Sequence, residues 1–278
     1  MESISWLKAV LIGLFQGLTE FLPVSSSGHI MILNEWLGIN LEGDFLSFFT
    51  ILLHIGTLIA VFIMYYKNIW QMIRHPFKSD LKWLIAATIP TVIYALILKF
   101  TGAEDVLDGA ARTILPWAFF ATSIFLYMAD KFAEYHLVGK TKLRHKNVNL
   151  RDALFMGLMQ CIGTFAGVSR SGSTIMGGLA SGLNRKRVAD FSFLMSIPAI
   201  LGAALLDTLD LVESGTMSTI TIDWLPIALG VAAAMVSGLL AIRFMLFMIK
   251  KIHLKWFAVY TGILGAFILI NDFLISKL

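Results

Sequence analysis

The feature that most constrains this chain is a series of six long runs that contain no Asp, Glu, Lys or Arg. A helix that crosses a membrane needs about 20 mostly apolar residues, within a range of about 17–25. Three of the runs are slightly shorter, but flanking lysine side chains can extend to the membrane surface and close the gap. We therefore predict six membrane-spanning helices, in the runs Phe45–Tyr66, Trp83–Leu98, Thr113–Ala129, Phe191–Leu206, Trp224–Ile242 and Trp256–Asn271.

The composition supports an integral membrane protein. Hydrophobic residues make up 58% of the 278 residues and charged residues only 14%. Soluble domains carry about 25% charged residues, so this chain has too few to cover an aqueous surface. We predict an all-α fold with one polytopic membrane domain over residues 1–278. The single cysteine, Cys161, excludes an intrachain disulfide framework and a multi-cysteine metal site.

Two further apolar regions are interrupted by polar residues. Residues 9–34 are broken by Glu20 and Pro23, and residues 153–184 by Arg170 and a cluster of Ser and Gly. The resulting pieces are about 11–17 residues long, which is typical of re-entrant segments. Irregular backbone at membrane depth is tolerated only where protein or a water-filled cavity satisfies it. We therefore expect two re-entrant helical hairpins, and we expect the functional site there.

The basic residues predict how the chain is oriented. Most of the 22 Lys and Arg residues fall in four segments that lie on one side if the spans alternate: 67–82, 131–151, 185–187 and 250–255. Basic loops stay in the cytoplasm, so both termini are expected outside. The net charge of +4 is then a signal of topology, and we predict no nucleic-acid partner.

The same alternation makes the two hairpins enter the membrane from opposite faces. QGLTEFLPVSSSGHI at 16–30 aligns without gaps on QCIGTFAGVSRSGST at 160–174, and three spans follow each copy. This pattern is typical of an inverted-topology repeat, in which two broken segments form a site near the midplane. We predict repeat 1 over about 1–144 and repeat 2 over about 145–278. A chance match of Ser and Gly residues is the alternative.

The first hairpin carries groups that can handle protons. Gln16 and Glu20 are four residues apart and share one helix face. A carboxylate in a membrane costs about 2.5–3.5 kcal/mol, so it normally faces a cavity, a partner charge or a metal ion. The alternative is a structural ion pair between Glu20 and Arg170. Pro23 ends the helix, and the turn that we expect after it contains Ser25, Ser26, Ser27, Gly28 and His29.

The second hairpin resembles a phosphate cradle, and we expect it to precede a helix over Ile175–Leu183. Backbone N–H groups at a helix start bind anions, and hydroxyl groups add donors. Arg170 adds a planar, permanently charged fork suited to phosphate oxygens. The candidate phosphate-binding residues are Ser169, Arg170, Ser171, Gly172, Ser173 and Thr174. The alternative is close helix packing, which we prefer for Gly177, Gly178 and Gly182.

Together the hairpins offer what phosphoryl transfer requires: charge neutralisation, a nucleophile and a group that exchanges protons. His29 titrates near neutral pH and is a candidate general acid or base, although a buried histidine is often structural. For His54, within a predicted span, we favour a structural role. For Asp190 we favour a charge role at a helix N-terminus.

These motifs resemble a known family. QGLTEFLPVSSSGH is similar to the (E/Q)-x-x-x-E motif and adjoining Ser/His stretch of the bacterial undecaprenyl-diphosphate phosphatases, also called bacitracin-resistance proteins. GVSRSGST is similar to their P-G-x-S-R-S-x-x-T motif, with Ala166 in place of the Pro. The resemblance covers essentially the whole chain. It implies hydrolysis of undecaprenyl diphosphate to the monophosphate, which recycles the lipid carrier for peptidoglycan synthesis. It also implies bacitracin resistance, because that drug sequesters the diphosphate.

The resemblance also assigns roles to individual residues. It implies Glu20, Ser26, His29 and Arg170 as catalytic residues, and it leaves open whether Ser26, His29 or water attacks. It implies magnesium or calcium as a cofactor, held by Glu20, because Gln16 removes the other acidic position. The remaining candidates for binding the substrate are Gln16, Ser25, Ser27, Ser169, Ser171, Gly172, Ser173 and Thr174. The implied location is the bacterial plasma membrane with the site on its outer side, among membrane lipids, and a homodimer stays open.

Two other functions are compatible with the residues. A transporter or flippase for a phosphate-bearing prenyl lipid would also use inverted repeats and broken helices. It would bind the headgroup without releasing phosphate. An ion-coupled carrier with Glu20 as the coupling carboxylate is a weaker alternative, because it gives no reason for the serine-rich turns.

Overall fold

The computed structural model describes residues 4–38, 44–138, 147–213, 215, 223–251 and 253–275, and the regular elements in them are helices. In chain order they are α1 (Trp6–Phe21), α2 (Ser26–Trp36), α3 (Asp44–Arg74), α4 (Leu81–Thr101), α5 (Ala103–Val138), α6 (Leu150–Ile162), α7 (Arg170–Ala180), α8 (Arg185–Glu213), α9 (Trp224–Lys251) and α10 (Lys255–Ile275). Residues 139–146 of the basic segment 131–151, which include the predicted boundary between the repeats, lie outside the described residues.

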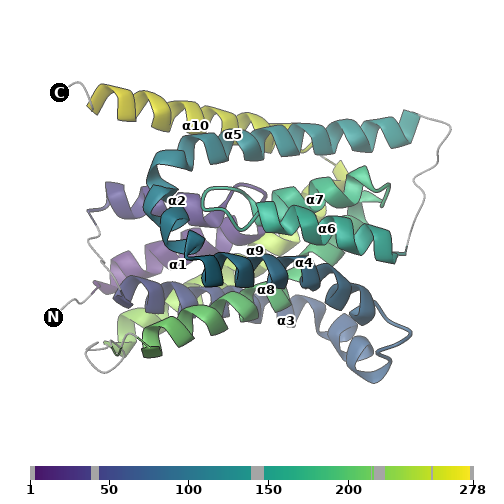
Figure 1. Ribbon diagram of the computed structural model, residues 1–278, viewed down its shortest axis with the longest axis horizontal. Helices are drawn as coiled ribbons and strands as arrows, with labels where there is room; N and C mark the ends of the chain where they lie inside the picture. Colours follow the sequence, from purple (N-terminus) through teal and green to yellow (C-terminus); the bar gives the residue numbers. More distant parts are fainter. Residues whose placement is uncertain are drawn as a thin grey trace.

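The six predicted spans are confirmed as helices long and apolar enough to cross a membrane. They lie within α3, α4, α5, α8, α9 and α10, at Phe45–Arg74, Leu81–Thr101, Ala103–Tyr135, Arg185–Glu213, Trp224–Ile249 and Lys255–Phe273. The chain is therefore a multi-pass membrane protein. The start of α1 and the end of α10 lie at the same end of the molecule (Figure 1).

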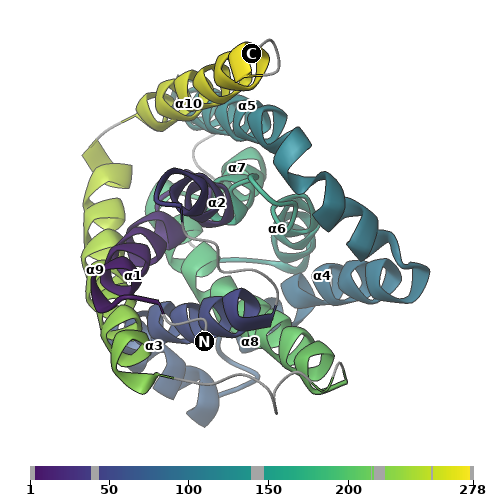
Figure 2. The same ribbon diagram turned by 90° about the vertical axis from the view of Figure 1, so that its left-hand side faces the viewer.

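The four short helices lie inside a ring formed by the six long ones (Figure 2). In Figure 1 the pair α1 and α2 extends toward the centre from one end of the molecule, and the pair α6 and α7 from the other. The turns of the two pairs meet in the interior. This arrangement places two polar turns where the long helices shield them.

Glycines allow the short helices to lie directly against the backbone of long ones. A Cβ atom on Gly13 of α1 would lie 2.1 Å from the carbonyl oxygen of Gly230 in α9. A Cβ atom on Gly157 of α6 would lie 2.2 Å from the carbonyl oxygen of Ala87 in α4. Small residues are used in this way where helices pack closely in membranes. Each short pair is thus wedged against a long helix that lies far away in the sequence.

A large apolar cluster packs around the turns. Its fully buried side chains include Phe21, Met156, Ile175, Phe191 and Phe193. The rings of Phe21 and Phe193 meet edge to face, with their centroids 5.7 Å apart. Edge-to-face pairs add about 0.5–1.5 kcal/mol beyond the buried area, so this contact helps to fix the end of α1 against α8.

Two predicted helix starts are wrong because serine caps begin both helices earlier than expected. Ser25 is the N-cap of α2, so Ser26 is already helical. Ser169 is the N-cap of α7, and its Oγ accepts a hydrogen bond from the N–H of Gly172 at 3.0 Å. A cap of this kind satisfies a backbone donor that the first turn leaves free. Arg170 therefore occupies the first position of the helix and does not belong to the preceding loop.

Two smaller predictions also need correction. α7 ends at Ala180 instead of Leu183, and Gly182 lies beyond it, in a turn, with a φ of +91°. Asp190 lies one and a half turns inside α8, where it accepts a hydrogen bond from the hydroxyl of Tyr65 at 2.9 Å. Its role is this contact with α3, since the helix begins at Arg185.

Candidate active site

The turn between α1 and α2 and the turn between α6 and α7 are joined by direct hydrogen bonds. The Oγ of Ser27 accepts from the backbone N–H of Gly167 at 3.2 Å. The Oγ of Ser171 donates to the carbonyl oxygen of Leu22 at 3.1 Å. The two segments that sequence analysis selected are therefore in contact, although about 140 residues separate them.

Glu20 is the centre of the site. Its side chain is buried, and Oε1 accepts a hydrogen bond from Nη2 of Arg170 at 2.6 Å. Oε2 accepts from Nε2 of Gln16 at 3.0 Å and from the hydroxyl of Ser26 at 2.7 Å. Burial favours the protonated acid, but Arg170, His54 and the bond from Ser26 outweigh it and lower the pKa of the Glu20 carboxyl. The carboxylate is therefore charged and bonded to both hairpins.

The ion pair between Glu20 and Arg170 matches the structural alternative raised from the sequence. Both of its members also lie among the polar groups of the site. The side chain of Arg170 is 14% exposed, whereas that of Glu20 is 5% exposed. The guanidinium is thus the more accessible partner, which suits it to receive an anionic group.

Hydrogen bonds within the protein fix the start of α7. The N–H of Ser169 donates to the hydroxyl of Thr122 at 2.9 Å, and Gly167 has a φ of +86°. The hydroxyls of Ser173 and Thr174 are fully buried and donate to the carbonyl oxygen of Arg170, both at 2.9 Å. These two side chains therefore stabilise the first turn of the helix from within.

His29 uses both of its ring nitrogens. Nδ1 lies 2.6 Å from the carbonyl oxygen of Ser25, and Nε2 lies 2.7 Å from the hydroxyl of Tyr260. Burial lowers the pKa of the His29 imidazole, so the ring is neutral at neutral pH. Among the described residues, its hydrogen bonds reach Ser25 and Tyr260, while the hydroxyl of Ser26 points to Glu20. Ser26 is thus hydrogen-bonded to Glu20, and no hydrogen bond joins Ser26 to His29 among the described residues.

Two residues were missed as members of the site. Nε2 of His54 lies 3.7 Å from Oε2 of Glu20, although the sequence favoured a structural role for this histidine. Tyr260 reaches His29 from α10, 231 residues away. Both lie within long apolar helices and outside the two motifs. For His54, the sequence signal was an isolated imidazole within the apolar run Phe45–Tyr66; we find no such signal for Tyr260.

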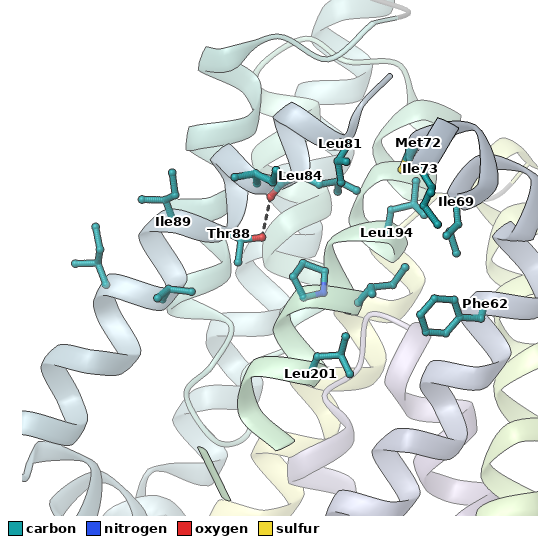
Figure 3. Close-up of a pocket in the computed structure, with 15 residues that line it drawn as sticks. Phe62, Ile69, Met72, Ile73, Leu81, Leu84, Thr88, Ile89, Leu194 and Leu201 are labelled. Carbon is teal, nitrogen blue, oxygen red and sulfur yellow. Dashed lines mark hydrogen bonds between the residues drawn. The ribbon is translucent and has the colours of Figure 1, made fainter. Parts of the chain in front are cut away.

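Two cavities lie on either side of the contact between α4 and α8. One of about 520 Å³ is lined by apolar side chains and by Thr88, whose hydroxyl donates to the carbonyl oxygen of Leu84 at 2.7 Å (Figure 3). The other, of about 450 Å³, is lined in part by residues 164–166, which precede Gly167, and by Glu104 and Asp207. The second cavity therefore borders the turn between α6 and α7.

Comparison with known proteins agrees with the two motifs. The family model of bacitracin resistance protein BacA matches residues 9–267. The chain belongs to the bacitracin resistance protein BacA family. The match includes both hairpins and all six spans almost to their ends.

Curated relatives resemble the chain over nearly its full length. A protein of Carboxydothermus hydrogenoformans named undecaprenyl-diphosphatase is 39% identical, and the alignment covers 95% of this chain and 96% of the relative. Undecaprenyl-diphosphatase 3 of Bacillus cereus is 37% identical, with 97% and 98% covered. An undecaprenyl-diphosphatase of Halothermothrix orenii is 35% identical, with 95% and 96% covered. The site described above thus lies within a BacA family protein of ordinary length.

Proposed function

We propose that this chain hydrolyses undecaprenyl diphosphate to undecaprenyl phosphate and inorganic phosphate. The observation that carries the proposal is the contact of Glu20 with both Ser26 and Arg170, in a member of the BacA family. The product is the lipid carrier for peptidoglycan synthesis, so the enzyme recycles that carrier. Removal of the diphosphate also leaves less target for bacitracin, which accounts for the resistance that gives the family its name.

Binding of the terminal phosphate begins the proposed mechanism. Arg170 turns from Glu20 toward the phosphate oxygens, and the backbone donors at the start of α7 assist it. Glu20 then loses its counter-charge and becomes a stronger base. The pairing seen in the structure therefore keeps the carboxylate weakly basic until an anion takes Arg170 away.

Ser26 is well placed for the chemical step. Its Oγ attacks the terminal phosphorus, its proton passes to Glu20, and the bond from that phosphorus to the bridging oxygen breaks. Undecaprenyl phosphate leaves on the bridging oxygen, and water then hydrolyses the phosphoserine to free Ser26 and inorganic phosphate. A water molecule in the place of Ser26, also deprotonated by Glu20, gives the same products in one step.

A divalent cation fits this site only together with the substrate. Among the described residues, no group of three or more His, Cys, Asp or Glu side chains gathers around a common point. Glu20 is the carboxylate of the site, and Gln16 occupies the neighbouring acidic position of the family motif. Magnesium commonly binds through one or two carboxylates plus phosphate oxygens. If magnesium or calcium takes part, Glu20 and the phosphate oxygens would hold the ion, which would neutralise phosphate charge.

The hairpins are proposed to be re-entrant and related by an inverted repeat. The offset of 144 that aligns the motifs also relates Gly13 to Gly157, and each glycine lies against a carbonyl oxygen of a long helix from the other half. The first half would cover about 1–144 and the second about 145–278. With basic loops in the cytoplasm of a bacterial cell, both termini and the site face the outer side of the plasma membrane.

A flippase or transporter for the same lipid remains the second candidate. The four short helices that lie inside the ring of long helices support a transporter, because broken helices that meet in the interior are typical of transporters. Such a protein would bind the lipid diphosphate and move it without releasing phosphate. The distinction therefore depends on product formation.

The deciding experiment measures phosphate released from a C55 prenyl diphosphate by detergent-purified protein, with magnesium, calcium or a chelator. Glu20→Gln is expected to lower kcat by about 10²- to 10⁴-fold, because it removes the proposed base. Glu134→Gln, which removes a carboxylate of an exposed ion pair on α5, is the matched control and should keep full activity. Wild-type protein that binds the lipid but releases no phosphate would favour the transporter.

A further inference from the structure

The contact between Tyr260 and His29 links the last helix of the chain to the serine turn. Tyr260 lies on α10, is 46% exposed, and brings its hydroxyl to 2.7 Å from Nε2 of His29. Its ring is nearly parallel to the imidazole, with an interplanar angle of 16° and centroids 5.8 Å apart. Phe119 meets the imidazole edge-on at 5.4 Å. The imidazole is thus held between two aromatic rings and oriented by one hydroxyl.

The hydrogen bonds determine which ring nitrogen carries the proton. A carbonyl oxygen can only accept, so Nδ1 of His29 must donate to the carbonyl of Ser25. In the neutral ring Nε2 is then an acceptor, and the hydroxyl of Tyr260 is its donor. Tyr260 therefore stabilises the one tautomer in which His29 can hold Ser25.

The backbone of Ser25 requires this support. Among the described residues it is the one non-glycine with a positive φ, at +71°. Non-glycine residues in this region are strained, and they persist only where the surroundings fix them. The carbonyl of Ser25 accepts from both Nδ1 and the backbone N–H of His29, at 2.6 and 3.3 Å. The residue that follows is Ser26, whose hydroxyl must reach Glu20.

We propose that Tyr260 is a positioning residue of this site, which acts through His29 to fix the strained peptide of Ser25 and so to aim Ser26 at Glu20. The proposal rests on the phosphatase function proposed above. It assigns the helix α10 a direct part in the site, which neither sequence motif contains. Tyr260 does not touch the reacting atoms in this role.

The first test is Tyr260→Phe, which keeps the ring and removes the hydroxyl. We expect kcat to fall about tenfold while KM stays within about twofold, because one hydrogen bond that orients the nucleophile is lost. The thermal midpoint should fall by no more than about 2–4 °C, since one hydrogen bond is lost and the ring contacts remain. Tyr127→Phe on α5, where the ring is 54% exposed, is the matched control and should leave kcat unchanged.

Two readouts separate positioning from a general structural effect. In ¹⁵N-histidine NMR, with the His29 signals assigned by their loss in His29→Ala, the Nε2 resonance should move in Tyr260→Phe. In the His29→Ala background, Tyr260→Phe should cause no further loss of activity. An unmoved Nε2 resonance, or an undiminished tenfold loss without His29, would overturn the proposal. A wild-type protein without phosphatase activity would refute the proposed function, and the NMR comparison would still decide whether Tyr260 orients His29.

Discussion

The two hairpins have the same capping scaffold but carry different chemistry. Ser25 and Ser169 both cap a helix, and each accepts from the N–H three residues later, at 3.3 and 3.0 Å. At equivalent positions the first hairpin has Glu20 and the second Thr164, while Arg170 takes the place that Ser26 holds in the first. The first turn thus lies beside a carboxylate and a hydroxyl that can exchange protons, whereas the second lies beside a cation that can bind an anion.

The backbones of the two caps also differ. Ser25 has a φ of +71° and a ψ of 101°, whereas Ser169 has an ordinary extended conformation with a φ of −77°. The strained copy is the one that carries Ser26. Strain at functional sites is maintained by neighbouring contacts, and here those contacts come from His29. The cap of the second hairpin thus has an unstrained backbone, and the strained backbone is confined to the hairpin that carries Ser26.

The largest effect is expected from a substitution that removes the cation of the second hairpin. Arg170→Met should lower kcat/KM by about 10³-fold, because it removes the group that neutralises the phosphate. It should also lower the free energy of unfolding by about 3–5 kcal/mol, since Glu20 is left buried and charged without its partner. Phosphate release and thermal denaturation in detergent measure the two effects.

A double variant separates folding from chemistry in this test. Glu20→Gln with Arg170→Met should recover most of the lost stability and none of the lost activity. Arg112→Met, which breaks ion pairs with Glu35 and Asp272, is the matched control and should keep activity within about threefold, as surface pairs are weak. Recovery of activity in the double variant would contradict both proposed roles, since that protein has neither the base nor the phosphate-binding cation.

Substitutions with an intermediate expected effect test whether both hairpins pack equally closely against a long helix. Gly13→Ala and Gly157→Ala each place a methyl group against a carbonyl oxygen, so each should cost about 1–3 kcal/mol of stability. Gly109→Ala, where a Cβ atom meets nothing within 4 Å, is the control. Thermal midpoints that fall for only one of the two glycines would contradict the structural equivalence of the hairpins.

The smallest effect concerns the caps themselves. Glycine tolerates a positive φ and replaces a serine cap at a cost of only a few tenths of a kcal/mol. Ser25→Gly should therefore be more stable than Ser169→Gly by about 1 kcal/mol, because only position 25 relieves strain. Equal thermal midpoints for the two variants would mean that Ser25 is not strained in the folded protein.

Much of the fold could be predicted from the sequence because the membrane imposes strong rules. Uninterrupted apolar runs marked the six spans, and Glu20, Pro23 and Arg170 marked the interrupted segments. The starts of α2 and α7 were misplaced because a serine reads equally well as a loop residue and as a helix cap. Side-chain capping decides between them, and that depends on backbone geometry.

The partners of the site residues were harder to predict because they depend on contacts across the ring. From the sequence, His29 was a candidate general acid or base, and Ser26 lies three residues before it. In the structure, Ser26 donates a hydrogen bond to Glu20, and His29 is hydrogen-bonded to Tyr260. No periodicity marks Tyr260 within its apolar helix, so only the packing of α10 against the interior reveals it.

The wedging of α1 against α9 also determines when the site can form during synthesis. α1 carries Glu20 and leaves the ribosome first, but the backbone that it packs against begins at Trp224. Contacts between such distant parts of a chain form late, after the closure of a long loop. Tyr260 follows later still, on α10. The nascent chain therefore holds an unassembled carboxylate until α9 and α10 are inserted.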